Sequence, residues 1–181
     1  MSHQARSRLL ELFKKRAFAF GDFTLASGKK SSYYINSKKA IFHSEAVALL
    51  GELLWDTTKD LGIQAMGGLE VGAIPMTTAA AMRYHLQGRA LEGFFVRKQA
   101  KGHGSQERIE GVLEPGMRCV MVDDVLTTGG SVLQAIEEVE KRGALIQAVV
   151  CIVDRLEGAR ELLAPRYPYQ PLFTIRDFGI A

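Results

Sequence analysis

The sequence predicts an α/β fold in which a central parallel sheet is flanked by helices. Three observations predict it: apolar runs of strand length recur along the chain, glycine-containing turns follow them, and segments of helical periodicity come next. Strands that read as continuous apolar runs are typical of parallel sheets covered on both faces. Ligands of such sheets bind beyond the carboxyl ends of the strands, so we expect a functional site there.

The N-terminal part of the chain predicts a helix followed by a hairpin. Apolar residues from Leu9 to Phe13 have helical spacing, and the basic residues 14–16 suit the end of a helix. Between residues 22 and 39, β-forming residues are interrupted by the polar stretch 27–30, which predicts two short strands joined by a turn. We expect this hairpin to form a small lobe at about residues 20–40.

From Ser44 onwards, helices and strands alternate. We expect Ser44 to cap a helix that ends near Gly62. The strands expected after it cover residues 64–69, 90–96, 118–122, 146–153 and 172–175, and the helices cover residues 75–86 and 132–142. Residues 98–116 are rich in glycine and charge and lack apolar periodicity, which is typical either of a lid over an active site or of a disordered, solvated loop.

Length and composition bound the remaining possibilities. With 181 residues, 47% of them hydrophobic, the chain is expected to form one domain over residues 1–181. A net charge of +3 is too small for a nucleic-acid surface but suits a small polyanionic ligand. We expect a cytoplasmic protein without membrane contact, because no apolar stretch approaches the ~20 residues of a membrane span. Cys119 and Cys151 lie in apolar runs and are expected to be buried thiols.

The strongest functional signal is the segment 120–131, in which an apolar strand leads to two adjacent carboxylates, Asp123 and Asp124. The chain then turns through hydroxyl and glycine residues into a helix. Gly129 and Gly130 allow close approach of the backbone to a ligand, and N–H groups at a helix start can cradle a phosphate. The carboxylates suit the vicinal hydroxyls of a ribose, or a metal beside them. A simple helix-capping corner is the alternative, whereas a Walker A loop or a dinucleotide-binding glycine pattern is absent from the sequence.

This segment resembles the phosphoribosyl-diphosphate (PRPP) signature of type I phosphoribosyltransferases, and other segments are similar to orotate phosphoribosyltransferases in particular. Residues 97–104, Arg-Lys-Gln-Ala-Lys-Gly-His-Gly, resemble the catalytic loop of that family, and residues 23–36 resemble the hairpin that forms a hood over the base. Residues 67–75 resemble its diphosphate loop, and residues 153–155, Val-Asp-Arg, resemble its base-binding strand end. The likeness covers nearly the whole chain.

The resemblance implies a type I phosphoribosyltransferase fold with a small N-terminal hood hairpin, and it implies a set of site residues. The residues implied to bind PRPP are Arg97, Lys98, Lys101, His103, Asp123, Asp124, Val125, Leu126, Thr127, Thr128, Gly129, Gly130 and Ser131. Those implied to be catalytic are Lys101, His103, Arg97 and Asp124, with Asp124 only a candidate for a general base. Those implied to bind orotate are Thr127, Arg155, Tyr34 and Ile35.

The resemblance also implies the reaction and its partners. PRPP and orotate would give orotidine 5′-phosphate and diphosphate in pyrimidine synthesis, with Mg²⁺ carried mainly by PRPP rather than by a protein metal site. A homodimer with shared active sites is expected. Two positions depart from the family pattern, because Ala26 and Glu70 stand where many members carry Lys.

Several alternatives stay open. Arg155 suits bidentate binding of the orotate carboxylate, but a plain ion pair with Asp154 or Glu157 fits the sequence equally well. A purine or uracil phosphoribosyltransferase would share the PRPP segment without the hairpin, loop and Arg155 together. A non-catalytic PRPP-sensing regulator or a flavodoxin-like nucleotide-binding module would share only the phosphate cradle.

Overall fold

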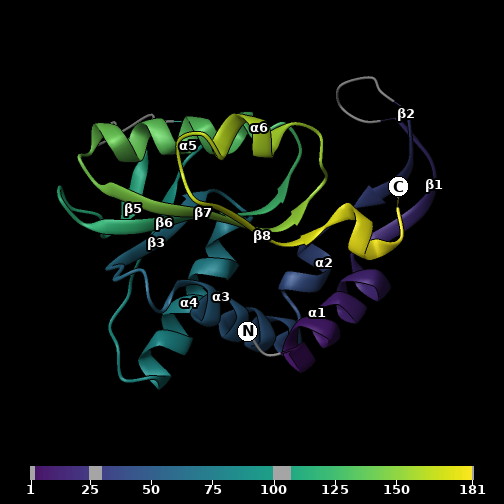
Figure 1. Cartoon of the computed structure of the whole chain (residues 1–181), viewed down its shortest axis with the longest axis horizontal. Coiled ribbons are helices and arrows are strands. Elements are labelled where there is room, and N and C mark those ends of the chain that lie inside the picture. Colours follow the sequence, from purple (N-terminus) through teal and green to yellow (C-terminus); the bar gives the residue numbers. More distant parts are fainter. Residues whose placement is uncertain (1–2, 25–29, 100–106, 181) are drawn as a thin grey trace.

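A computed structural model describes residues 3–24, 30–99 and 107–180. Within these residues the chain forms a two-stranded hairpin and a six-stranded sheet with helices on both sides (Figure 1). The elements are α1 His3–Arg16, β1 Phe18–Thr24, β2 Lys30–Ile35, α2 Lys38–Ile41, α3 Ser44–Thr58, β3 Ala65–Leu69, α4 Ala73–Leu86, β4 Glu92–Val96, β5 Ile109–Gly111, β6 Arg118–Leu126, α5 Gly130–Lys141, β7 Leu145–Asp154, α6 Ala159–Leu163, β8 Tyr169–Thr174 and the 3₁₀ helix η1 Ile175–Phe178.

The strand order of the main sheet is β5-β4-β3-β6-β7-β8. All neighbouring strands are parallel except β5, which pairs antiparallel with β4 at the edge. The chain moves outward from β3 to β4 in one direction and from β6 to β7 and β8 in the other. The order therefore reverses between β3 and β6, and their carboxyl ends border the crevice in which such sheets bind ligands.

Alternation along the central strands divides the core between the two faces of the sheet. Val120 and Val122 of β6 pack with the side chains of α1, α3 and α4, whereas Cys119 and Met121 pack with those of α5 and α6. Figure 1 shows these two helical layers on opposite sides of the sheet. Both cysteines are buried thiols, as the sequence predicts, and burial raises the pKa of Cys119 to about 12.

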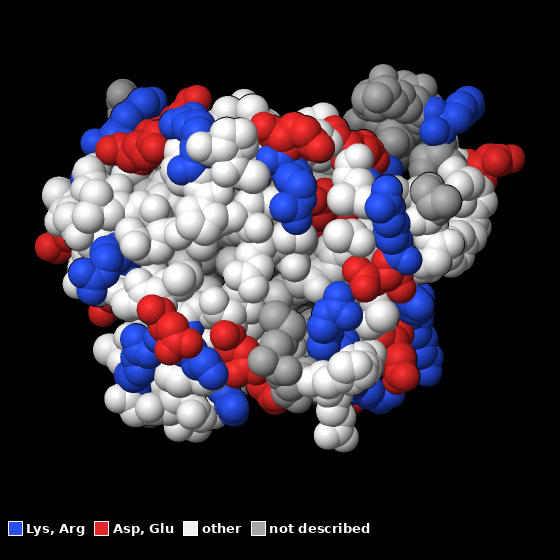
Figure 2. All heavy atoms as spheres, in the orientation of Figure 1, with Lys and Arg blue, Asp and Glu red and all other residues white. Residues whose placement is uncertain are grey.

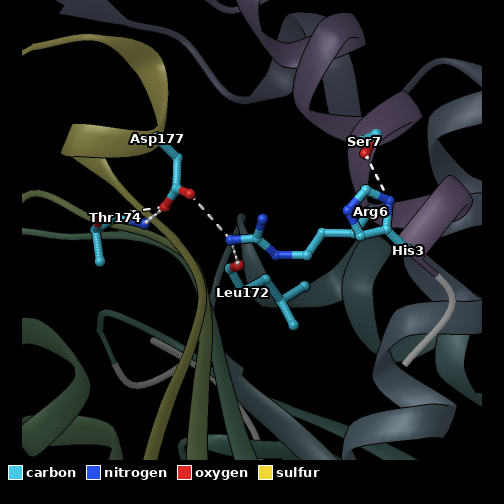
Figure 3. Close-up of polar contacts among 6 residues, drawn as sticks. All are labelled: His3, Arg6, Ser7, Leu172, Thr174 and Asp177. Atoms are coloured by element: carbon cyan, nitrogen blue, oxygen red, sulfur yellow. Dashed lines mark hydrogen bonds and ion pairs between the residues drawn. The ribbon is translucent and has the colours of Figure 1, made fainter.

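The two ends of the chain are joined by one side chain of α1. The Arg6 guanidinium donates to the Leu172 carbonyl oxygen and to Asp177 Oδ1, each at 3.1 Å (Figure 3). It also lies 4.7 Å from the centre of the Phe173 ring. Asp177 Oδ2 also accepts from the Thr174 backbone N–H, which caps η1. These contacts fix the chain that follows β8 against α1, beneath the hairpin.

The hairpin β1–β2 lies beyond the carboxyl ends of the central strands, where a hood over the site is expected. Phe18 of β1 stacks on Phe178 of η1 with ring centres 4.4 Å apart. The residues that follow β2, Ser37 and Lys38, donate hydrogen bonds to Asp124 of β6. The hairpin is thus attached to the main sheet both at its edge and at the crevice.

The α/β architecture and the order of the predicted elements are confirmed, with three corrections to their limits. Ser44 does not cap α3 but is its first residue: His43 is the N-cap, and its carbonyl accepts from the Val47 N–H. The segment 98–116 is not loop throughout, since residues 109–111 form the edge strand β5, too short to show periodicity. The expected strand 118–122 continues to Leu126, because its pairing with β7 continues to Asp154.

The hairpin also differs from its expected limits. Strand β1 begins at Phe18, before the expected start at residue 22, and residues 38–41 are helical. The structure adds two elements that the sequence pattern does not indicate, α6 and η1. Each is only about one turn long, so its apolar residues are too few to define a period.

Candidate active site

A crevice of about 260 Å³ lies at the carboxyl ends of β3 and β6. Four segments line it: the turn after β3, the start of the 98–116 segment, the end of β6 with the following turn, and α2. The lining residues are Lys38, Leu69, Glu70, Val71, Gly72, Lys98, Asp123, Asp124, Val125, Leu126, Thr127, Thr128, Gly129, Gly130 and Ser131. The crevice therefore coincides with the point at which the strand order reverses.

The two carboxylates of the crevice lie within β6 and are nearly buried. Asp123 and Asp124 are 9% and 5% exposed, respectively. Asp124 Oδ2 accepts hydrogen bonds from Ser37 Oγ and from Lys38 Nζ, the latter at 2.6 Å. Asp123 Oδ1 accepts from the backbone N–H of Asp124 at 2.8 Å. One carboxylate thus has a cation beside it, and the other has only a backbone donor among these contacts.

This environment separates the acidities of the pair. Burial, together with the neighbouring charge of Asp124, raises the pKa of Asp123 well above its usual value. Burial acts in the same direction on Asp124, but the hydrogen bonds from Lys38 and Ser37 prevail and lower the pKa of that carboxyl. The pair therefore favours one ionised carboxylate, at Asp124, beside a carboxyl that ionises less readily.

Glycines allow the crevice walls to approach one another. A Cβ at Gly72 would clash with the Asp124 carboxylate, so a glycine here lets the turn after β3 pack on this side chain. Gly129 has φ +83°, in the left-handed region that favours glycine, and it starts α5 without a side-chain cap. The first N–H groups of a helix lack partners within the helix, and here Thr128, Gly130 and Ser131 are exposed beside them. An anion can therefore contact both the backbone and the hydroxyls.

The start of the 98–116 segment is held by Glu70. The Lys98 backbone N–H donates to Glu70 Oε1 at 3.0 Å, and Lys98 lines the crevice. Arg97 points elsewhere: its Nε lies 3.0 Å from Glu110 Oε1 of β5, and its guanidinium lies 5.9 Å from the centre of the Phe95 ring. Of these two neighbouring cations, the structure brings Lys98 to the crevice and leaves Arg97 paired at the sheet edge.

Arg155 follows β7 and lies between the hairpin and a carboxylate. Its side chain is 10% exposed, its Nε lies 2.8 Å from Glu157 Oε1, and its guanidinium lies 4.9 Å from the centre of the Tyr33 ring. The Arg155 backbone N–H donates to the Leu126 carbonyl at 2.9 Å, which places this residue next to the end of β6. The ion pair with Glu157 that the sequence left open is thus present.

The other predicted base-binding residues of the hairpin point in different directions. Tyr34 is 46% exposed, and its ring lies 5.8 Å from that of Phe23. Ile35 is partly buried and packs against the larger hydrophobic core. Because side chains alternate along a strand, Tyr33 faces Arg155 while the side chain of Tyr34 points away.

Comparison with known proteins gives the family. The model of the phosphoribosyl transferase domain family matches residues 43–176. The chain is 42% identical over 179 residues to an orotate phosphoribosyltransferase of Bradyrhizobium sp., covering 96% of this chain and 97% of that protein. It is also 42% identical over 178 residues to one from Corynebacterium glutamicum, covering 98% and 95%. The chain belongs to the orotate phosphoribosyltransferase family.

Solved structures of orotate phosphoribosyltransferases have the same fold. That of Mycobacterium tuberculosis in complex with Fe(III) dicitrate has a TM-score of 0.86 at 37% identity and covers 97% of this chain and 99% of its own. The same enzyme in complex with PRPP has a TM-score of 0.82 at 33% identity, with the same coverage. The type I phosphoribosyltransferase fold expected from the sequence is therefore confirmed.

Of the predicted site residues, the structure brings together residues 123–131 and Lys98 at one crevice. Lys101 and His103, and also Ala26, lie outside the described residues. Ser37 and Lys38, which contact Asp124, and Tyr33, which contacts Arg155, were not among the residues predicted from the sequence. A signal for Lys38 was present, since Lys38 and Lys39 form a basic pair directly after the hairpin, but only the fold shows which of them faces Asp124.

Proposed function

We propose that the chain transfers the 5-phosphoribosyl group of PRPP to orotate, giving orotidine 5′-phosphate and diphosphate in pyrimidine synthesis. One observation carries the proposal. At the reversal point of the sheet, two nearly buried carboxylates stand beside a partly exposed turn of hydroxyls and glycines that leads into α5 and lines the same crevice. A ribose with a phosphate on one side matches this pairing of acceptors and donors.

The parts of the crevice suit different parts of PRPP. Thr127–Ser131 would hold the 5-phosphate through hydroxyls and N–H groups at the helix start. The ionised Asp124 and its neighbour Asp123 would accept hydrogen bonds from the ribose hydroxyls. The turn Glu70–Gly72 and Lys98 form the opposite wall, where the diphosphate would lie.

In the proposed reaction, the main task of the cationic residues is to stabilise the leaving diphosphate. Breaking the bond between the anomeric carbon and the diphosphate oxygen leaves an oxocarbenium-like ribose and places negative charge on the leaving group. Lys98, with Lys101, His103 and Arg97 as the family resemblance implies, would stabilise that charge where it develops. Attack by the orotate ring nitrogen on the opposite face inverts the anomeric centre. Because this nitrogen can ionise, no single general base is required, and Asp124 is only a candidate.

Arg97 can take this role only if it leaves Glu110. In the structure its Nε is paired with Glu110 Oε1 at 3.0 Å, on the edge strand β5. A surface ion pair of this kind contributes about 0.2–1 kcal/mol, so a bound diphosphate can replace it.

Mg²⁺ is part of the proposal. The described residues contain no group of three or more His, Cys, Asp or Glu arranged to hold a metal ion. The carboxylates of Asp123 and Asp124 provide hard oxygen ligands beside the crevice, and Mg²⁺ typically uses one or two carboxylates together with phosphate and water oxygens. The site therefore fits a Mg²⁺ held mainly by PRPP, which would neutralise charge on the diphosphate.

Base recognition is proposed for Arg155, Thr127 and the hairpin. A guanidinium at the end of β7 can bind the orotate carboxylate in a bidentate manner, which uracil does not offer. The side chain of Tyr33, rather than that of Tyr34, lies against this guanidinium. Tyr34 and Ile35 would then contact orotate through their backbone groups, or through their side chains after movement of the hairpin.

The proposal also covers the domain organisation, the oligomeric state and the cellular location. We propose that one domain, residues 1–181 with its hood at about 20–40 and catalytic loop at about 98–116, works as a homodimer with shared sites in the cytoplasm. No helix of the described residues is long and apolar enough to cross a membrane. Figure 2 shows Lys and Arg interspersed with Asp and Glu on the visible face, a pattern without a continuous basic surface for nucleic acid.

The test is diphosphate release from PRPP with Mg²⁺ and one base at a time. We expect release with orotate and not with uracil, adenine or guanine. Release with a purine or uracil instead would assign the chain to another phosphoribosyltransferase reaction. Binding of PRPP without release for any base would favour a PRPP-sensing regulator.

A further inference from the structure

The guanidinium of Arg155 already has a carboxylate partner in the ligand-free structure. Glu157 Oε1 lies 2.8 Å from Arg155 Nε, and the Tyr33 ring covers the guanidinium at 4.9 Å. The Arg155 side chain is only 10% exposed, whereas that of Glu157 is 36% exposed. The cation is thus fixed in a nearly buried place, and its anionic partner still reaches solvent.

The turn between them is built to fold Glu157 back onto Arg155. Asp154 Oδ1 accepts from the Leu156 backbone N–H at 2.7 Å, and Leu156 adopts φ +58°, a left-handed conformation unusual for leucine. Gly158, with φ +112°, completes the reversal. A hydrogen bond from the Ala159 N–H to the Thr127 carbonyl, at 3.1 Å, ties the turn to the phosphate cradle.

A nearly buried guanidinium without a partner would be unfavourable, because the cation loses hydration that no other group replaces. Glu157 offsets part of this cost in the free protein, because its charge lies 2.8 Å from Arg155 Nε, although the N–H of that atom is not aligned to donate a hydrogen bond to it. When a second carboxylate binds Arg155, Glu157 can return to solvent from a position that is already partly exposed. Exchange of one carboxylate for another conserves the charge around the cation.

We propose that Glu157 is a specificity-determining residue, an internal carboxylate that occupies Arg155 until the carboxylate of orotate displaces it. This inference rests on the proposed function. A base without a carboxylate cannot replace Glu157 at the guanidinium, so the Arg155–Glu157 pair remains closed to it. The same pair lowers the affinity for orotate, because each binding event must break it.

The test is Glu157→Gln, which removes the charge and keeps the shape. We expect KM for orotate to fall about threefold to fivefold, the equivalent of one partly exposed ion pair, while KM for PRPP stays within twofold. Orotate binding measured by calorimetry should tighten by the same factor. Glu161→Gln, an exposed glutamate of α6, is the matched control and should change neither value.

Whether Glu157 acts through Arg155 is tested by making the same substitution in an Arg155→Ala variant. In Arg155→Ala, the change Glu157→Gln should no longer alter the KM for orotate, because the competing pair is already lost. A Glu157→Asp variant keeps the charge on a shorter side chain and should lie between wild type and Glu157→Gln. Circular dichroism and thermal melts establish that each variant is folded.

The opposite sign would overturn the inference. If Glu157→Gln weakens orotate, Glu157 stays bound to Arg155 in the complex and orients it for the base. If Glu161→Gln tightened orotate binding by the same factor, the effect of Glu157→Gln would be due to the change in net charge and not to the pair with Arg155. Failure of the proposed function has a different signature, since wild-type protein would then release no diphosphate with orotate.

Discussion

Lys38→Met should weaken use of PRPP by about tenfold while leaving the fold intact. Lys38 Nζ lies 2.6 Å from Asp124 Oδ2, and its side chain is 48% exposed against 7% for that of Asp124. A hydrogen bond to a charged group contributes about 1.5–3 kcal/mol. Solvent screens the half-exposed ammonium, and Ser37 still donates to the same oxygen, so we take the lower end, about 1.5 kcal/mol. That corresponds to a roughly tenfold lower kcat/KM for PRPP.

The pH dependence gives a second readout of Lys38. The lowered pKa of Asp124 keeps this carboxylate ionised as the pH falls, and the hydrogen bond from Lys38 is one of the causes that lower it. Without Lys38 the pKa of Asp124 rises, so the acidic limb of the kcat/KM profile for PRPP should move to higher pH.

Two matched variants complete this experiment. Lys39→Met removes an adjacent exposed charge that does not line the crevice and should leave kcat/KM unchanged. Lys38→Arg retains a cation and should restore most of the activity. The role of Lys38 is refuted if folded Lys38→Met keeps kcat/KM for PRPP within twofold of wild type and the acidic limb of its pH profile does not move. It is also refuted if Lys39→Met loses as much activity as Lys38→Met.

Four further predictions concern the carboxylates, the base and the loop. The double variant Asp123→Asn with Asp124→Asn should fold but show no detectable turnover; a near-normal rate and PRPP affinity would remove the carboxylates from the ribose site. Asp123→Asn alone should raise the melting temperature at pH 7, because the raised pKa of Asp123 makes its ionised form unfavourable in the folded state. This gain should shrink as the pH falls toward the unfolded value of about 3.9, and a gain independent of pH would contradict the assignment. Arg155→Ala should raise mainly the KM for orotate, by about 10- to 150-fold, which corresponds to about 1.5–3 kcal/mol of lost binding energy. A rise confined to the KM for PRPP would place the base elsewhere. Finally, Lys101→Ala and Asp124→Asn should each be nearly inactive, yet regain part of the activity when their subunits exchange; exchange without recovery would mean that the loop serves its own subunit.

The contiguous features of the site could be predicted from the sequence. The segment 120–131 carries its carboxylates, hydroxyls and glycines in one run, and the structure places Asp123 through Ser131 along one crevice. Local order suffices here because a strand, a turn and a helix start are determined by neighbours in the chain. The position of the crevice followed from the alternation of strands and helices.

The direction of individual side chains in the hairpin and the edge of the sheet could not be predicted in this way. Motif matching selected Tyr34 and Arg97, but Tyr33 faces Arg155, and Arg97 turns to Glu110. Both outcomes depend on the pairing of strands: the alternation of β2 selects Tyr33, and the short strand β5 brings Glu110 to Arg97. A three-residue strand carries too little pattern to be recognised.

By itself the sequence determined the α/β fold, the family and the segment 123–131 that lines the crevice, because periodicity and contiguous motifs are local properties of the chain. Only the tertiary structure decided which groups surround the Asp124 carboxylate and the Arg155 guanidinium. Lys38 and Asp124 are 86 positions apart in the chain and meet through the packing of the hairpin on the sheet. Tyr33 likewise reaches Arg155 from the hairpin. Such contacts set the pKa of Asp124 and the environment of Arg155, and they depend on distances in space that no local pattern contains.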